Sequence, residues 1–162
     1  MTKRLILMRH AKSSWHHSGP DHGRPLNERG YESAPKVGAW LRASGFEPDA
    51  ILSSDAKRTR ETCAGLGFDV PTRFERSLYL ADPETMFAEL KAETADTVLM
   101  LGHNPGIAVF ADELVKTRPD HARFFDYPTC ATTVMDFGIN DWSQLAYGSG
   151  VVQGFAIPRE LP

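Results

Sequence analysis

Short runs of consecutive apolar residues recur along the chain, and each is followed by polar residues. The clearest runs are Leu5-Ile6-Leu7-Met8 and Val98-Leu99-Met100-Leu101, in which apolar and polar positions do not alternate. Such runs of β-compatible residues are typical of strands that are buried on both faces. On this pattern the sequence predicts strands at about 3–9, 49–53, 97–101, 132–138 and 151–157, and a short strand or extended loop around 74–80.

Four helices are predicted between these strands, at about 27–44, 55–64, 82–92 and 104–116. Asp55 and Asp82 are expected to be N-cap residues, because their carboxylates can accept hydrogen bonds from the free backbone N–H groups of a first turn. Gly45 is expected to end the first helix, and Gly65 and Gly67 to close the second. The alternation of strands and helices predicts an α/β fold: a three-layer α/β/α sandwich with a mostly parallel central sheet.

Length and composition favour a single domain covering residues 1–162. The formal net charge of −3 argues against a general nucleic-acid-binding protein, because such domains usually carry a basic face. The two cysteines, Cys63 and Cys130, indicate neither a disulfide framework nor a zinc site. No segment approaches the roughly 18 apolar residues of a membrane span, and the apolar stretch after the basic start is too short for a signal peptide. We therefore expect a cytoplasmic protein with no membrane or nucleic-acid partner.

Three polar segments that follow buried runs carry the candidate chemistry. They contain Arg9-His10, Arg58 and His103. In an open parallel sheet, ligands bind just beyond the carboxyl ends of the strands, so three neighbouring strands would bring these side chains to one edge. Arg58 would lie in the first turn of its helix, where an anion is also favoured. Arg60 is two residues further on, roughly 200° around a helix with about 3.6 residues per turn, and cannot point the same way.

Two guanidinium groups and an imidazole that converge on one point are suited to a phosphoryl group. Arginine presents a planar pair of donors that matches phosphate oxygens, and phosphoryl transfer mainly needs positioning and charge stabilisation. A histidine nucleophile must be neutral at its attacking nitrogen. Positive charge on Arg9 and Arg58 disfavours protonation of His10 and so keeps this ring available near neutral pH.

Other nucleophiles and phosphate sites lack their residues in this sequence. A cysteine phosphatase needs an arginine six residues after its cysteine, but Asp69 follows Cys63 at that spacing and Asp136 follows Cys130. There is no Gly-x-x-x-x-Gly-Lys phosphate loop, no His-Glu-x-x-His zinc motif and no Gly-x-Ser-x-Gly nucleophile elbow. A histidine therefore remains the best candidate nucleophile.

Four segments occur in a recognisable order: 7–15 (LMRHAKSSW), 24–30 (RPLNERG), 53–62 (SSDAKRTRET) and 102–106 (GHNPG). Together they resemble the motifs of the histidine phosphatase superfamily. Ala11 stands after the histidine, where most branches carry glycine, and this is similar to the SixA-type phosphohistidine phosphatase branch. The resemblance covers roughly the whole chain and implies a phosphoglycerate mutase-like fold.

The resemblance also implies roles for individual residues. His10 would be the nucleophile that becomes phosphorylated, and water would then hydrolyse the intermediate. The groups that would hold the phosphoryl oxygens are Arg9, Arg58 and His103. Ser14, Arg24 or both would approach the substrate, and the family needs no metal or other cofactor.

One departure from the family pattern concerns the general acid. Larger relatives that cleave phosphate esters place a glutamate shortly after the second arginine, in a Leu-x-Glu setting, and this chain has Tyr79 in the nearest equivalent place. An alkoxide leaving group gains greatly from a positioned acid, whereas a protonated imidazole leaves as a neutral ring. The missing glutamate therefore favours a phosphoramidate substrate. The short chain leaves little material for the cap insertions that enclose small substrates, and this favours a phosphohistidine side chain of a protein. Asp21, Asp82 and Glu84 remain candidate acids.

Several alternatives stay open at this level. The chain could instead be a small-molecule phosphomonoesterase that acts on a small phosphorylated substrate, or a phosphate-binding module without turnover. Trp15 could flank the cleft or anchor its loop on the core, and Arg24 could simply fix the same loop. His16, His17 and His22 lack a carboxylate or cysteine at ligand spacing and are a poor metal site. Arg29 is interpreted as a solvated charge.

Overall fold

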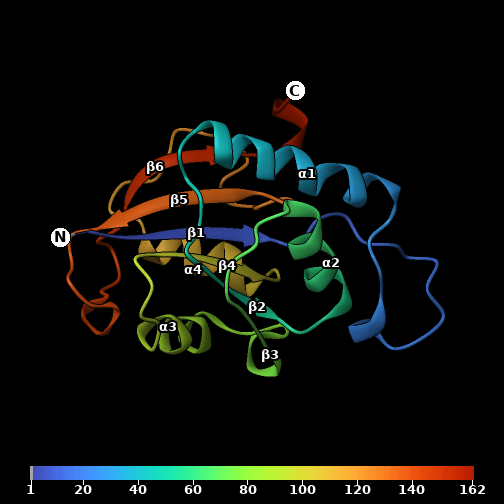
Figure 1. Ribbon diagram of the computed structural model, residues 1–162, viewed down its shortest axis with the longest axis horizontal. Coiled ribbons are helices and arrows are strands. Elements are labelled where there is room, and N and C mark those ends of the chain that lie inside the picture. Colours follow the sequence, from blue (N-terminus) through green and yellow to red (C-terminus); the bar gives the residue numbers. More distant parts are fainter. Residues whose placement is uncertain (1) are drawn as a thin grey trace.

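The computed structural model describes residues 2–162 and contains a six-stranded sheet. The strands are β1 (Lys3–Arg9), β2 (Ala50–Ser54), β3 (Thr72–Glu75), β4 (Thr97–Gly102), β5 (Thr132–Phe137) and β6 (Val151–Ala156). Their order in the sheet is β3-β2-β4-β1-β5-β6 (Figure 1). The first four strands in this order run parallel, and β5 is antiparallel to both β1 and β6. The predicted α/β fold with a mostly parallel sheet is confirmed.

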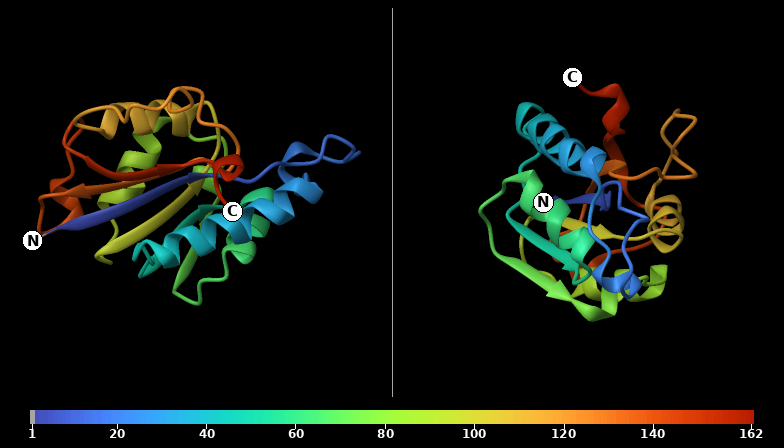
Figure 2. Two further views of the ribbon diagram at one scale, coloured as in Figure 1. Left: turned by 90° about the horizontal axis from the view of Figure 1, so that it is seen from above. Right: turned by 90° about the vertical axis from the view of Figure 1, so that its right-hand side faces the viewer.

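Helices cover both faces of the sheet. They are α1 (Glu28–Ala43), α2 (Lys57–Leu66), α3 (Pro83–Lys91) and α4 (Gly106–Leu114), with short 3-10 turns that include η1 (Asp21–Gly23) and η2 (Arg76–Leu78). The pair α1 and α2 lies on one side of the sheet and the pair α3 and α4 on the other (Figure 2, left). Across residues 2–162, none of the helices combines the length and apolar character that crossing a bilayer requires.

The unbroken apolar run of β1 follows from this layering. Side chains alternate between the two faces of a strand, so Leu5 and Leu7 join the core under α3 and α4, whereas Ile6 and Met8 join the core under α1 and α2. All four side chains are completely buried. A strand with a core on each side favours apolar residues at successive positions, and the run ends before Arg9, the last residue of β1.

Three details of the predicted helix ends are wrong. The N-cap of α2 is Ala56, and Asp55 lies one residue before it, because its carboxylate is used elsewhere. Gly65 lies inside α2, and only Gly67, with a φ of 75°, closes this helix in the left-handed conformation. The fourth helix ends at Leu114, and its C-cap, Val115, is extended. Asp82 is confirmed as an N-cap, and it accepts a hydrogen bond from the backbone N–H of Thr85 at 2.8 Å.

The sheet order brings the three polar segments to one edge. β4 lies between β1 and β2, and all three strands are parallel. The register pairs Arg9 with Gly102 and Ser53 with Leu101, so the residues that follow these strands lie beside one another. The long loop between β1 and α1 extends beyond this same end of the sheet (Figure 1). This edge is where the candidate site has to be sought.

The start of α4 depends on a glycine. A Cβ atom on Gly106 would lie 1.9 Å from the backbone carbonyl oxygen of Ala81, and backbone cannot move aside as a flexible side chain does. We expect Gly106→Ala to destabilise the protein by about 1–3 kcal/mol, the usual cost of overpacking. Gly138→Ala is the matched control, because its Cβ would meet no atom within 4 Å. Urea unfolding should separate the two variants, and equal midpoints would contradict this packing argument.

Candidate active site

Backbone hydrogen bonds on both sides hold His10 at the carboxyl end of β1. Its N–H donates to the carbonyl of Gly102 at 3.1 Å, and its carbonyl accepts from the N–H of Cys130 at 2.9 Å. The next N–H, that of Ala11, donates to the hydroxyl of Thr62 in α2 at 3.0 Å. The backbone position of His10 is therefore set by β4, by the segment before β5 and by α2.

The His10 ring is buried and has one polar partner. Only 5% of the residue is exposed, and Nδ1 lies 2.7 Å from the carbonyl oxygen of Ala11. A carbonyl can only accept, so Nδ1 carries the proton and Nε2 keeps its lone pair. Burial is the main cause that holds the pKa of His10 well below its usual range, and the charges of Arg9 and Arg58 act in the same direction. The expected neutral histidine is therefore supported, although burial contributes more than the arginines do.

His103 lies beside His10 and is held by a serine of β2. The centroids of the two rings are 5.3 Å apart. Nε2 of His103 is 2.8 Å from the hydroxyl oxygen of Ser54, and this oxygen also accepts from the N–H of Ala56 at 3.2 Å. Burial and the positive charge of Arg58 lower the pKa of His103 to about 3. Both histidines are therefore neutral at pH 7.

Arg58 points into the same region from the first turn of α2. It is 2% exposed, and its two terminal nitrogens donate to the backbone carbonyl and the carboxylate of Asp21 at 2.9 and 3.0 Å. Arg60 is turned away, since it bonds the carbonyl of Asp55 and lies over the ring of Phe74. The helical spacing that favoured Arg58 over Arg60 is confirmed in this respect.

Arg9 completes the group from β1. Its Nη1 donates to the carbonyl of Tyr127 at 3.2 Å, and the side-chain amide of Asn104 donates to the same carbonyl at 3.1 Å. Burial lowers the pKa of Arg9, and the positive charge of Arg58 lowers it further, because the two guanidinium groups are close enough to repel. The loop before β5 thus anchors one end of the Arg9 side chain.

Buried polar side-chain atoms without a hydrogen-bond partner gather at this site. Within residues 2–162, four buried side-chain polar atoms have no hydrogen-bond partner, and three of them are Arg9 Nε, Arg58 Nε and His103 Nδ1. The fourth is Asn104 Oδ1, in the residue next to His103. Buried polar groups are almost always paired, and each exception needs an explanation. A tetrahedral oxyanion beside His10 would supply acceptors to both guanidinium groups.

Asp21 and Tyr79 form the opposite side of the site. The Asp21 carboxylate accepts hydrogen bonds from the Tyr79 hydroxyl, Arg58 and Arg24, and these bonds, that of Tyr79 most strongly, lower its pKa to about 2. Asp21 is thus ionised at neutral pH and has no proton to donate, which argues against its role as a general acid. The Tyr79 ring lies 5.5 Å from that of His103, centroid to centroid. Burial and Asp21 raise the pKa of Tyr79, so its hydroxyl stays protonated.

Ser14 and Arg24, the two residues predicted to approach the substrate, form hydrogen bonds within their own loop. The Ser14 hydroxyl accepts from the N–H of His16 at 3.1 Å. Arg24 is buried, donates to the Ser13 hydroxyl and to Asp21, and lies over the Trp15 ring at 3.9 Å. Trp15 is 77% exposed, so the alternative that it anchors the loop on the core is wrong. Its ring is exposed and packs against the guanidinium of Arg24.

The histidines of this loop lie apart. His16 and His17 are exposed, whereas His22 bonds Asp55 at 2.7 Å and packs edge-on against Tyr79. The described part of the chain holds no group of three or more His, Cys, Asp and Glu side chains arranged to bind a metal ion. The contact with His22 also explains why Asp55 does not cap α2.

The chain is similar to several known proteins. Residues 5–79 match the family model of the histidine phosphatase superfamily (branch 1). An uncharacterized protein of Mycobacterium tuberculosis is 35% identical over 159 residues, which cover 94% of this chain and 100% of that protein.

Two solved structures are similar over nearly their whole length. A protein provisionally named phosphohistidine phosphatase SixA, from Nakamurella multipartitia, has a TM-score of 0.83 and 30% identity, covering 98% of this chain and 97% of its own. A protein with the same provisional name, from Agrobacterium tumefaciens, has a TM-score of 0.76 and 25% identity, covering 96% and 98%.

The lowered pKa of His103 predicts how stability depends on pH. An unfolded histidine takes up a proton near pH 6.5, whereas folded His103 does so only near pH 3. Between these values the unfolded chain binds more protons, so the free energy of unfolding falls as the pH is lowered, by at most about 1.4 kcal/mol per pH unit for each such histidine. We expect His103→Gln to reduce this slope between about pH 6.5 and 5.

His16→Gln is the control, because His16 is exposed and should leave the slope unchanged. Urea unfolding at several pH values measures both variants. A slope for His103→Gln equal to that of the unsubstituted protein would contradict a buried, neutral His103.

Proposed function

Because this chain belongs to the histidine phosphatase superfamily, we propose that it is a phosphohistidine phosphatase, which removes the phosphoryl group from a phosphorylated histidine of a protein. The observation that carries the proposal is the set of buried donors without acceptors on Arg9, Arg58 and His103, gathered around the neutral ring of His10. Unpaired donors in a largely buried site are suited to stabilising the charge of a transferring phosphoryl group.

In the first step, Nε2 of His10 attacks phosphorus in line with the bond to the substrate nitrogen. The new bond joins phosphorus to His10, and the bond that breaks releases the substrate ring. That ring, protonated on its other nitrogen, leaves as a neutral imidazole. Arg9, Arg58 and His103 donate to the phosphoryl oxygens during the transfer. His103 can do so because the Ser54 hydroxyl can donate to Nε2, which leaves the proton of the neutral ring on Nδ1.

In the second step, water attacks the phosphorus of phosphorylated His10. The bond to Nε2 breaks, dihydrogen phosphate forms, and His10 returns to its neutral form. Nδ1 keeps its proton throughout, because it donates to the carbonyl of Ala11 in both states. The positive charge that the phosphorylated ring carries is therefore next to a fixed carbonyl dipole.

The leaving group and the nucleophile are both imidazole rings, and this favours a phosphohistidine substrate over a phosphate ester. An imidazole is exchanged for an imidazole, and neither needs a positioned carboxylic acid when it leaves. Tyr79, whose pKa is raised, and Asp21, whose carboxylate is ionised, are the groups facing His103 from the opposite side. A poor leaving group such as an alkoxide would find no strong acid at these positions.

The experiment that tests this function compares substrates. We expect the protein to release phosphate from a phosphohistidine peptide with a kcat/KM about 10²-fold or more above that for sugar phosphates, the factor a positioned general acid supplies to an ester. His10→Ala should abolish release and His16→Ala should not, and excess chelator should have no effect. Faster hydrolysis of the esters would favour a phosphomonoesterase. Saturable binding without phosphate release would show a binding module.

A second experiment tests the arginine. Removing a donor that acts in the transition state typically costs about 10²- to 10³-fold in rate, and we expect this loss for Arg58→Ala. Arg60→Ala removes the same charge two residues further along α2, where the side chain faces away. Its kcat should stay within about twofold of the unsubstituted protein, since surface changes away from the site have small effects. Equal losses in both variants would remove the proposed role of Arg58.

A further inference from the structure

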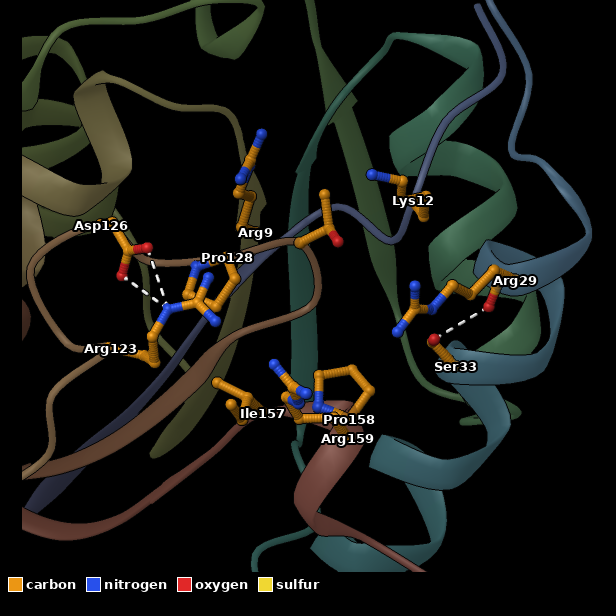
Figure 3. Close-up of a pocket in the computed structure, with 11 residues that line it drawn as sticks. Arg9, Lys12, Arg29, Ser33, Arg123, Asp126, Pro128, Ile157, Pro158 and Arg159 are labelled. Carbon is orange, nitrogen blue, oxygen red and sulfur yellow. Dashed lines mark hydrogen bonds and ion pairs between the residues drawn. The ribbon is translucent and has the colours of Figure 1, made fainter.

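A cavity of about 400 Å³ lies at the carboxyl end of β1, on the side of this strand that faces β5 and β6. Its lining comes from the loop after β1, the first turns of α1, the loop before β5 and the segment after β6. We call it the basic cavity, because its charged lining residues are Arg9, Lys12, Arg29, Arg123, Arg159 and Asp126 (Figure 3). Five cations thus surround one carboxylate, in a chain whose formal net charge is −3.

Most of these cations have no counter-ion. Arg123 pairs with Asp126 at 2.9 Å, but Lys12, Arg29 and Arg159 form no ion pair within the described residues. Lys12 and Arg29 extend towards the middle of the group from one side, and Arg123 lies on the opposite side (Figure 3). Unpaired like charges collected around a hollow raise the local concentration of anions. The arrangement is therefore suited to an anionic ligand.

Arg9 connects the basic cavity to the candidate active site. Its side chain extends away from Arg159 and Ile157 (Figure 3), although the residue borders the cavity. Its guanidinium interacts with charges on both sides: Arg58 lowers the pKa of Arg9, and Asp126 raises it. A molecule whose phosphoryl group lies beside His10 would therefore have its neighbouring groups within reach of the cavity.

We propose that the basic cavity binds carboxylate side chains of an acidic segment next to the phosphohistidine in the substrate protein. The inference rests on the proposed function, since it takes the carrier of the phosphoryl group to be a protein. Arg123 already pairs with a carboxylate at the cavity wall, which is the contact that the proposed ligand would make with Arg29 and Arg159. Guanidinium groups bind carboxylates with two parallel hydrogen bonds.

The cavity is less suited to a small phosphorylated molecule. Small-molecule sites bury most of the ligand surface and usually present aromatic side chains. Here Lys12, Arg29 and Arg159 are exposed, and none of the residues that line the cavity is aromatic. Exposed cations on separate segments match an extended acidic chain that passes over them better than an enclosed ligand.

The test uses two phosphohistidine peptides that differ only in replacing acidic flanking residues with glutamine or asparagine. We expect a higher kcat/KM for the acidic peptide, by about three- to tenfold at low ionic strength, the range that two exposed charge pairs supply. Arg29→Gln combined with Arg159→Gln should bring the ratio close to one. Lys36→Gln is the matched control, because it removes a positive charge from an exposed position of α1 outside the cavity and should leave the ratio unchanged.

Binding of the same peptides without the phosphoryl group separates this inference from the proposed function. If neither phosphopeptide is hydrolysed but the acidic peptide still binds through Arg29 and Arg159, the proposed function fails and the docking site stands. If both peptides are hydrolysed and bound equally well, or if the preference survives in the double variant, the docking site is refuted. Tight binding of tripolyphosphate that the double variant loses, without any preference between peptides, would also refute it in favour of a small-anion site.

Discussion

The parallel pairing of β1 with β4 is the constraint on which the candidate site depends. Because Arg9 pairs with Gly102, the histidine that follows each strand lies beside the other, with ring centroids 5.3 Å apart. β2 pairs with the far side of β4 and adds Ser54, which holds His103. A slip of one residue in this register would exchange the two faces of β1. The two hydrophobic cores prevent that slip, so packing far from the site fixes its geometry.

The second requirement is electrostatic. Two guanidinium groups lie near two histidines, and protonation of either ring would add a further like charge to the site. Burial keeps both rings neutral, and Asp21 is the carboxylate that meets Arg58. Asp21 uses only the terminal nitrogens of that side chain and leaves Nε free. The site thus holds its charges in place and still lacks acceptors, a state that a bound oxyanion would stabilise.

The strands and the direction of Arg58 can be predicted from local sequence. Contacts between residues far apart in the chain cannot. Apolar runs locate the strands because two cores favour apolar residues at successive positions, and helical periodicity separates Arg58 from Arg60. Asp55 is different: local rules make it an N-cap, but it bonds His22, which lies 33 residues earlier in the chain. The contact between Asp21 and Arg58 likewise spans 37 residues. No pattern in the sequence indicates such loop contacts.

The basic cavity illustrates the same limit, and on the proposed function it separates recognition from chemistry. The sequence alone predicts a solvated charge at Arg29, and this residue is exposed. Only the fold places it among cations from three other segments. The reacting groups stand at strand ends, whose positions the sheet fixes, whereas the charges around them come mostly from loops and helix starts. Loops tolerate substitution far better than strands do. If the cavity binds the substrate protein as proposed, changes in these segments would alter which carrier binds while the candidate site keeps its geometry, because the two share only Arg9.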